Sequence, residues 1–291
     1  MLHTGLQLYP LRALSTLFRR VACLLTLSWL AACAVPFDPN ERLSVDVPTR
    51  AQIADVPLIQ QAAFFCGPTS IAMVMQWAGS DITQEEVAAL AFSPGAGGTY
   101  LADMTGSSRR LGQLAVEIST FDQLLAEVSS GHPVIIFQNL GLGIAPVWHY
   151  GVVTGFDFDK DEVYLNSGQL DRMVMPFAVF ERTWRRGGFW GLVVLSPDIL
   201  PTSVPETEVL SAAAALERVG QLDAAETLYD TGAAQWPDNW LWQFGLGNTR
   251  YAKGDLRGAR TALRQAKAID PSIPEVRANL AHVEGELAGS G

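Results

Sequence analysis

The feature that most restricts the fold of this chain is an internal repeat with a period of 34 residues near its C-terminus. Small, bulky apolar and proline residues recur at this spacing. The aligned pairs are Gly220 and Gly254, Ala225 and Ala259, Tyr229 and Leu263, and Pro237 and Pro271, and the same step relates Leu246 to Leu280. Small residues suit the crossing point of two helices, and proline ends the second helix. The segment therefore predicts stacked helical hairpins with an incomplete last unit as a cap.

This pattern resembles the tetratricopeptide repeat, which has the same period. The resemblance implies an all-α domain over residues 206–291 that binds a protein partner. Aromatic residues gather where the first unit meets the second, and we interpret them as core of that junction rather than as a ligand site. They are Trp236, Trp240, Trp242 and Phe244.

The N-terminus carries an export pattern. Three arginines precede an almost entirely apolar stretch over residues 21–32. This stretch is too short to span a bilayer as a helix, but it fits the apolar region of a signal peptide. We therefore expect residues 1–32 to be removed.

The residues at the end of this stretch, Leu30-Ala31-Ala32-Cys33, resemble the bacterial lipobox, in which the cysteine receives a diacylglycerol. Simple secretory cleavage after Ala32 is the alternative. Because Ala34 and not aspartate follows, we expect an outer-membrane lipoprotein facing the periplasm, with the cell surface as the alternative. Several acyl chains would anchor it stably.

The charge of the chain limits its partners. The net charge is −10, and removing residues 1–32 takes away three arginines and no acid, which gives −13. This acidity disfavours nucleic acid or an anionic membrane surface as the main partner, so the lipid is the expected membrane contact.

The remaining chain divides into two folded segments. Residues 33–54 are polar and suit a tether, and residues 197–205 contain three prolines and suit a stiff linker. Between them, residues 55–196 predict an α+β domain, with helices first and an antiparallel sheet afterwards. The expected helices cover 66–77, 84–91, 121–130 and, more weakly, 99–111; the expected strands cover 134–138, 150–156, 163–166 and 190–195.

Cys66 is the one thiol that this processing leaves free, since Cys23 is removed and Cys33 is acylated. Exported proteins normally pair their cysteines or have none, so an unpaired thiol indicates useful reactivity. Cys66 begins an amphipathic helix, where the positive end of the helix dipole favours the thiolate. The sequence therefore predicts a nucleophile.

A thiol nucleophile needs an imidazole to carry its proton. His3 is removed with the signal peptide, and His282 lies in the repeats. His132 precedes proline in a turn, and we interpret it as a surface residue. His149 begins a strand, Trp148-His149-Tyr150-Gly151-Val152-Val153, and is a candidate for this role; a residue at the end of a sheet with only local hydrogen bonds is the alternative interpretation.

The pattern of Cys66-Gly67-Pro68-Thr69 at a helix start, then His149-Tyr150-Gly151-Val152-Val153 entering a strand, resembles papain-like cysteine peptidases. The closer resemblance is to the bacteriocin-processing, double-glycine peptidase-like family, over about residues 55–196. It implies that Cys66 is the nucleophile, that His149 is the base and that a glutamine helps to bind the oxyanion. Gln61 is favoured for this role, and Gln60 is the alternative.

The third catalytic position departs from the family pattern. The family commonly places Asp-Pro after the strand that follows the histidine, where this chain has Asn166-Ser167-Gly168. Asn166 is expected to orient the imidazole as the asparagine of papain-like enzymes does, and Ser167 is the alternative. The missing carboxylate leaves efficient catalysis open.

No cofactor or metal is expected. The acidic segment from Asp157 to Glu162 lacks the glycine and distal glutamate of a calcium loop, so a hairpin turn is the interpretation. We expect a membrane-tethered thiol peptidase that acts on a peptide or protein, with repeats that recruit a protein. A catalytically weak binding protein and a thiol-based acyl or amide transferase are the alternatives.

Overall fold

The computed structural model describes residues 43–168 and 170–289. The expected signal peptide and Cys33 lie outside the described residues. Within the described ranges, no helix combines the length and the apolar composition that crossing a bilayer requires.

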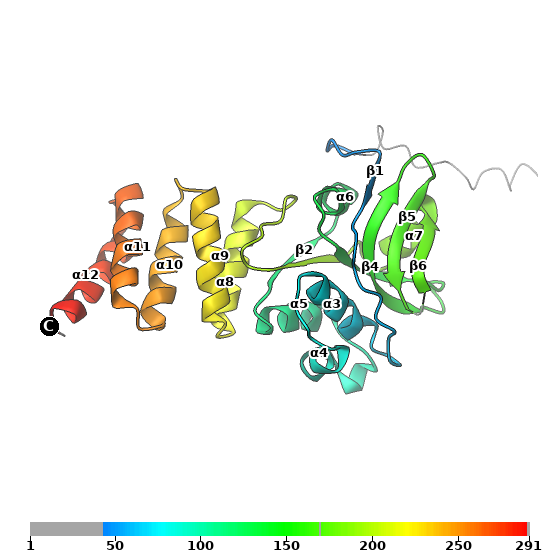
Figure 1. Cartoon of the computed structure of the whole chain (residues 1–291), viewed down its shortest axis with the longest axis horizontal. Coiled ribbons are helices and arrows are strands. Elements are labelled where there is room, and N and C mark those ends of the chain that lie inside the picture. Colours follow the sequence, from blue (N-terminus) through cyan, green and yellow to red (C-terminus); the bar gives the residue numbers. More distant parts are fainter. Residues whose placement is uncertain (1–42, 169, 290–291) are drawn as a thin grey trace, which may run out of the picture. The chain divides into compact units, whose positions relative to one another are not determined.

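Residues 50–195 form a mixed α and β domain around one antiparallel sheet (Figure 1). The strand order is β2-β7-β3-β4-β5-β6, and β1 pairs with β4. The strands are β1 (Arg50–Gln52), β2 (Leu114–Ile118), β3 (Val134–Asn139), β4 (Trp148–Asp157), β5 (Glu162–Ser167), β6 (Leu170–Pro176) and β7 (Gly191–Leu195).

Helices cover this sheet. They are α3 (Cys66–Trp77), α4 (Gln84–Ala91), α5 (Leu101–Arg110), α6 (Phe121–Ser129) and α7 (Phe177–Arg186). In strand β3, Val134, Ile135 and Ile136 are all fully buried, although successive side chains point to opposite faces of the sheet. Both faces are therefore covered. The helix α3 contacts β3, β4 and β7, whereas α6 and α7 both contact β3.

The helices expected over 66–77, 84–91, 99–111 and 121–130 are present as α3, α4, α5 and α6, and a capping box of Thr83 and Glu86 starts α4. The sequence analysis missed β2, β6 and α7. A signal for α7 was present, because Phe177, Phe180 and Trp184 are spaced by three and four residues and are all buried. The tether expected over residues 33–54 extends too far toward the C-terminus, since residues 50–52 form β1 and pair with the end of β4.

The C-terminal segment is entirely helical, as the repeat predicts. It consists of α8 (Glu206–Arg218), α9 (Leu222–Gln235), α10 (Trp240–Ala252), α11 (Leu256–Ile269) and α12 (Pro274–Gly289). Glycines set the helix spacing: a Cβ at Gly232 would lie 2.3 Å from the Trp242 ring, and one at Gly245 would lie 2.2 Å from the Tyr229 ring. Trp242 is fully buried and its ring stacks on that of the half-buried Trp236, so Trp242 is junction core, as interpreted.

The proline-containing connection and α8 both contact the sheet domain. The fully buried carboxylate of Glu127, on α6, accepts hydrogen bonds from the backbone N–H groups of Thr202 and Ser203 at 2.8 and 2.6 Å. Its other oxygen lies 2.6 Å from His132 Nδ1. The helix α8 contacts β2 and α5. The interpretation of His132 as a surface residue was wrong, because its ring is buried against this carboxylate.

Candidate active site

Cys66 is the first residue of α3, a helix whose following nine residues are all buried. Burial of this apolar helix against β4 fixes the position of the thiol. The next residue must be small, since a Cβ at Gly67 would lie 2.9 Å from both Met104 Sδ and Thr99 Cβ. Cys66 itself is a free, half-buried thiol.

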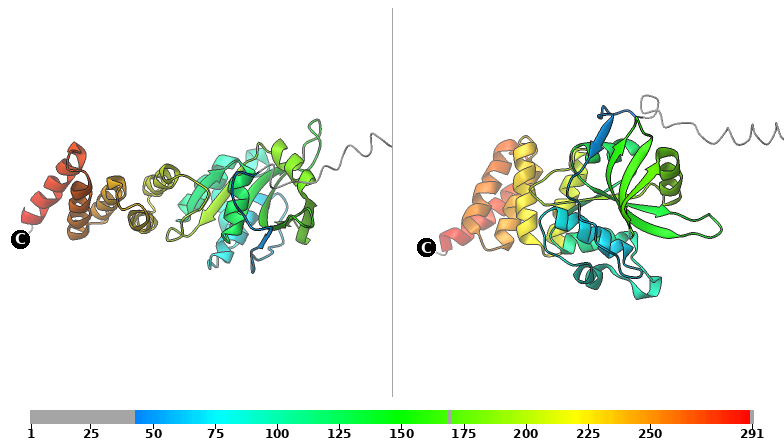
Figure 2. Two further views of the ribbon diagram at one scale, coloured as in Figure 1. Left: turned by 90° about the horizontal axis from the view of Figure 1, so that it is seen from above. Right: turned by 45° about the vertical axis from the view of Figure 1, so that its right-hand side comes forward.

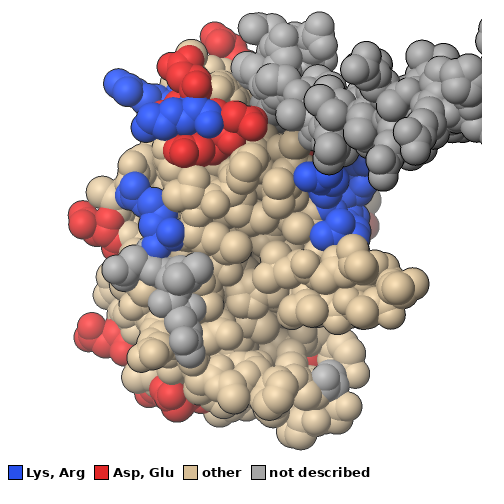
Figure 3. All heavy atoms as spheres, turned by 90° about the vertical axis from the view of Figure 1, so that its right-hand side faces the viewer, with Lys and Arg blue, Asp and Glu red and all other residues tan. Residues whose placement is uncertain are grey.

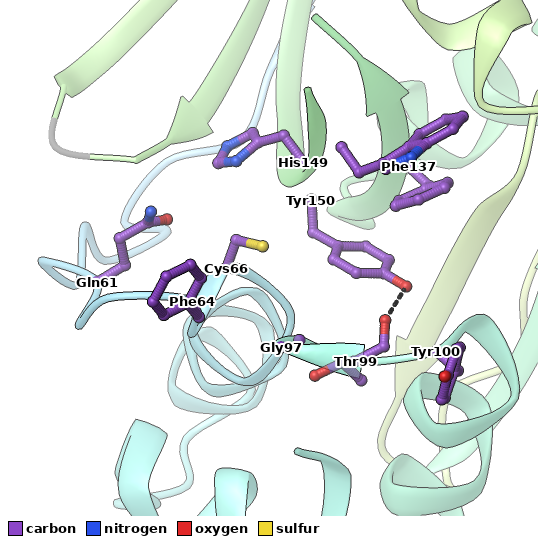
Figure 4. A pocket seen from close by; sticks show the side chains of 11 residues that line it. Gln61, Phe64, Cys66, Gly97, Thr99, Tyr100, Phe137, His149 and Tyr150 are labelled. Carbon is purple, nitrogen blue, oxygen red and sulfur yellow. Dashed lines mark hydrogen bonds between the residues drawn. The ribbon is translucent and has the colours of Figure 1, made fainter. Parts of the chain in front are cut away.

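Cys66 and His149 line one cavity of about 580 Å³. Figure 4 shows Cys66 at the helix start, with His149 entering from the sheet above it and Gln61 on one side. The structure thus brings together three residues that are 5 and 83 positions apart in the sequence.

His149 is the second residue of β4 and pairs with Gln138 of β3. Its Nε2 lies 2.7 Å from Ser167 Oγ, within hydrogen-bond distance. Burial lowers the pKa of the His149 imidazole from its ordinary value. A neutral ring whose Nε2–H donates to the serine leaves Nδ1 as the proton acceptor.

The structure places Ser167, and not Asn166, beside the imidazole. Asn166 pairs with Val152 in the register of β4 and β5, and its side-chain N–H₂ group donates to the carbonyl oxygens of Val56 and Pro57. Since successive strand residues face opposite sides, the next residue, Ser167, lies on the side of His149. The expectation that Asn166 orients the ring is corrected to Ser167.

The two candidate glutamines differ in position. Gln61 lines the cavity, whereas Gln60 is exposed and is held through its backbone carbonyl, which accepts from Gln84 Nε2 at 3.2 Å. The geometry thus favours Gln61, as the sequence analysis did.

A loop before α5 closes the cavity opposite His149, and the sequence analysis did not identify it. The Tyr150 hydroxyl donates to the carbonyl of Thr99 at 2.9 Å and ties this loop to β4. Burial raises the pKa of Tyr150, which keeps the hydroxyl protonated as a donor. The one signal in the sequence for this contact was that Tyr150 directly follows the candidate His149.

Two further expectations from the sequence, the hairpin turn at residues 157–162 and the position of His282 in the repeats, concern residues outside this cavity. Asp157 ends β4 and Glu162 begins β5, so the acidic segment is a hairpin turn, as interpreted. His282 lies on α12, where its Nε2 is 2.9 Å from the Tyr251 hydroxyl. Among the described residues, no cluster of His, Cys, Asp and Glu could hold a metal ion.

The structure thus consists of a mixed α and β domain that carries this cavity, followed by helical repeats. Residues 53–189 match the Peptidase_C39 like family, and residues 216–283 match the tetratricopeptide repeat. The chain thus combines a domain of the C39-peptidase-like type with a tetratricopeptide-repeat domain.

Three solved structures are similar to about half of this chain. A C39-like peptidase from Bacillus anthracis is 21% identical, with a TM-score of 0.44, and the match covers 50% of this chain and 97% of that one. A double glycine motif protease of an AMS/PCAT transporter, solved with the leader peptide, is 23% identical, with a TM-score of 0.38 and coverages of 52% and 98%. The peptidase domain of Streptococcus ComA, a bifunctional ABC transporter, is 18% identical, with a TM-score of 0.40 and coverages of 48% and 98%. A comparison with curated proteins finds no match.

Proposed function

We propose that this protein is a thiol peptidase in which Cys66 is the nucleophile and His149 is the base. The observation that carries the proposal is the meeting of Cys66 and His149 in one cavity, with the imidazole hydrogen-bonded to Ser167. Lowering of the His149 pKa by burial keeps the ring neutral near pH 7, so it can accept a proton.

The reaction then follows two stages. As the Cys66 sulfur forms a bond to the peptide carbonyl carbon, its proton passes to His149 Nδ1, and the carbonyl oxygen becomes an oxyanion. Collapse breaks the C–N bond, and the imidazolium gives its proton to the leaving amine. Water, deprotonated by His149, next attacks the thioester, which releases the carboxylate product and restores the thiol.

The oxyanion would be bound by two donors. The backbone N–H of Cys66 is in the first turn of α3, where no intrahelical acceptor exists. The side-chain amide of Gln61 lies at the same cavity. In other peptidases one such donor contributes about 3 kcal/mol to transition-state stabilisation.

Alkylation of Cys66 across pH tests the proposal. We expect iodoacetamide to modify Cys66 at pH 7 about tenfold faster than an exposed peptide cysteine, because the neutral His149 can take the Cys66 proton as the sulfur attacks. His149→Ala should remove most of this advantage, and His282→Ala serves as the matched control. A Cys66 that reacts like an ordinary thiol in both variants would contradict the proposal.

Two other functions use the same cavity. Ser167 cannot supply the negative charge that a carboxylate would give to the imidazolium, and this favours a catalytically weak protein that binds peptides. Acyl or amide transfer would follow if an amine, instead of water, attacked the thioester. Product analysis with an added amine distinguishes transfer from hydrolysis.

The two ends of the chain receive separate roles in this proposal. We propose that Cys33 carries lipid and holds the protein at the outer membrane, on the periplasmic side. The tetratricopeptide repeats would recruit a protein substrate or partner, which is the usual role of such repeats.

A further inference from the structure

The cavity wall beyond Cys66 consists of uncharged, mostly aromatic side chains. Phe137 of β3 stacks on Trp148 of β4 with ring centroids 5.1 Å apart, and its ring also lies 4.8 Å from that of Tyr150. Tyr100 adds a further ring from the residue before α5. None of the described lining residues is an acid, a lysine or an arginine. A charged group entering here would lose water without finding a counter-ion.

The cavity has room for a large group. Its volume of about 580 Å³ lies within the range of about 300–1,000 Å³ that is usual for small-molecule pockets. Part of the wall is formed by Gly97 and Gly98, which have no side chain. A Cβ at Gly98 would meet no atom within 4 Å, so the space beside this wall is open.

The surface beside the cavity is likewise uncharged and carries exposed apolar side chains. The turn between β3 and β4, residues 140–147, projects from the sheet (Figure 2) and contains no charged residue. It appears as an uncharged projection at the right of Figure 3. Ile144 at this turn is 95% exposed, and Phe64 on the cavity wall is 69% exposed. Phe64 thus adds an exposed apolar side chain at the cavity itself, which is typical of a binding surface.

We propose that the pocket walled by Tyr100, Phe137, Trp148 and Tyr150 binds a bulky apolar side chain of the substrate next to the scissile bond. The protein therefore selects peptides with large apolar residues at this position over glycine or charged residues. This inference rests on the proposed thiol-peptidase function. The size of the pocket and its lack of charged side chains are the evidence for the preference for large apolar residues.

Dipeptide chloromethyl ketones test it, because they place side chains on the acyl side of the reacting carbon. The Cys66 sulfur displaces chloride and forms a stable thioether. The reagents are acetyl-Xaa-Xaa chloromethyl ketones in which Xaa is Phe, Gly or Glu, applied to the full-length protein. Peptide mass spectrometry measures the rate at Cys66, and each rate is divided by that of glutathione with the same reagent. We expect the Phe reagent to exceed both the Gly and the Glu reagents by at least tenfold.

Two glycine variants locate this preference. Gly98→Leu adds a side chain at the cavity wall, and Gly95→Leu adds the same side chain in the same loop at a residue that does not line the cavity. At both positions a Cβ would meet nothing within 4 Å, and neither residue has the positive φ that would strain a leucine. We expect Gly98→Leu to lower the ratio of the Phe reagent rate to the iodoacetamide rate at least tenfold, and Gly95→Leu to leave it unchanged.

The outcomes separate the two proposals. Equal rates for the three reagents, a preference for Gly, or an equal effect of both leucine variants would overturn the apolar pocket while Cys66 still reacts with iodoacetamide. A Cys66 that has only ordinary thiol reactivity toward every reagent, iodoacetamide included, would overturn the proposed function and the pocket with it.

Discussion

At the residue scale, the unusual feature is a serine beside His149, the proposed base. Ser167 Oγ is 2.7 Å from His149 Nε2, so a neutral hydroxyl, and not a carboxylate, faces the imidazolium that forms when Cys66 gives up its proton. A hydroxyl orients the ring but stabilises its charged form less than a carboxylate does. The lowered pKa of His149 follows from burial, which is consistent with a base that is neutral at rest.

Substitution of this serine gives a direct prediction. Ser167→Asp should place a carboxylate against the imidazole, raise the pKa of His149 and increase the alkylation rate of Cys66 at pH 6–7 about tenfold, since an adjacent opposite charge shifts a pKa by about 1 unit or more. The pH profile of iodoacetamide labelling measures this.

The matched control is Asn166→Asp on the neighbouring residue. Asn166 donates to two backbone carbonyls, so a carboxylate there should destabilise the fold without accelerating alkylation. Equal acceleration by both variants would mean that a general increase in negative charge, and not the bond to His149, produces the effect.

At the scale of elements, the connection between the two domains is held by α6. Glu127 is fully buried and accepts two backbone N–H groups from residues 202 and 203. Thr202 Oγ1 also lies 3.1 Å from Ser130 Oγ. On the other side of α8, Gln221 Nε2 donates to the carbonyl of Arg110 at 2.6 Å. The chain is thus bonded to the sheet domain both before α8, through the proline-containing segment, and after it, through Gln221.

Removing the carboxylate should release this connection. Glu127→Ala takes the acceptor away from two backbone N–H groups and leaves the buried His132 without its partner, so we expect the free energy of unfolding in urea to fall by about 3 kcal/mol and proteolysis within residues 197–205 to accelerate. Glu127→Gln keeps one acceptor oxygen and should cost less.

Glu85→Ala, at an exposed position in the first turn of α4, is the control and should change stability by about 0.5 kcal/mol or less. Unchanged stability and unchanged proteolysis in Glu127→Ala would show that the connection holds without this carboxylate.

At the scale of the whole molecule, the proposed arrangement is a lipid anchor, a peptidase-like domain and a repeat domain in one acidic chain. The lipid would keep the protein at the membrane despite its negative charge, because apolar acyl chains and not basic residues supply the membrane affinity.

Cys33→Ser tests this anchor. The substitution removes the thiol that would carry the lipid, so we expect incorporation of a fatty-acid analogue to disappear and the protein to leave the membrane fraction. Cys23→Ser, in the expected signal peptide, is the control and should retain labelling. Equal labelling of both variants would exclude Cys33 as the attachment site.

The sequence by itself determined the features that depend on local spacing. The repeat helices follow from the 34-residue period, and α3, which begins at Cys66, follows from its apolar periodicity. Only the tertiary structure decided between Asn166 and Ser167, because a one-residue step in strand register moves a side chain to the other face of the sheet. It likewise buried His132 against Glu127 and assembled the aromatic pocket from β3, β4 and the loop before α5, since contacts between distant segments leave no periodic signal in the chain.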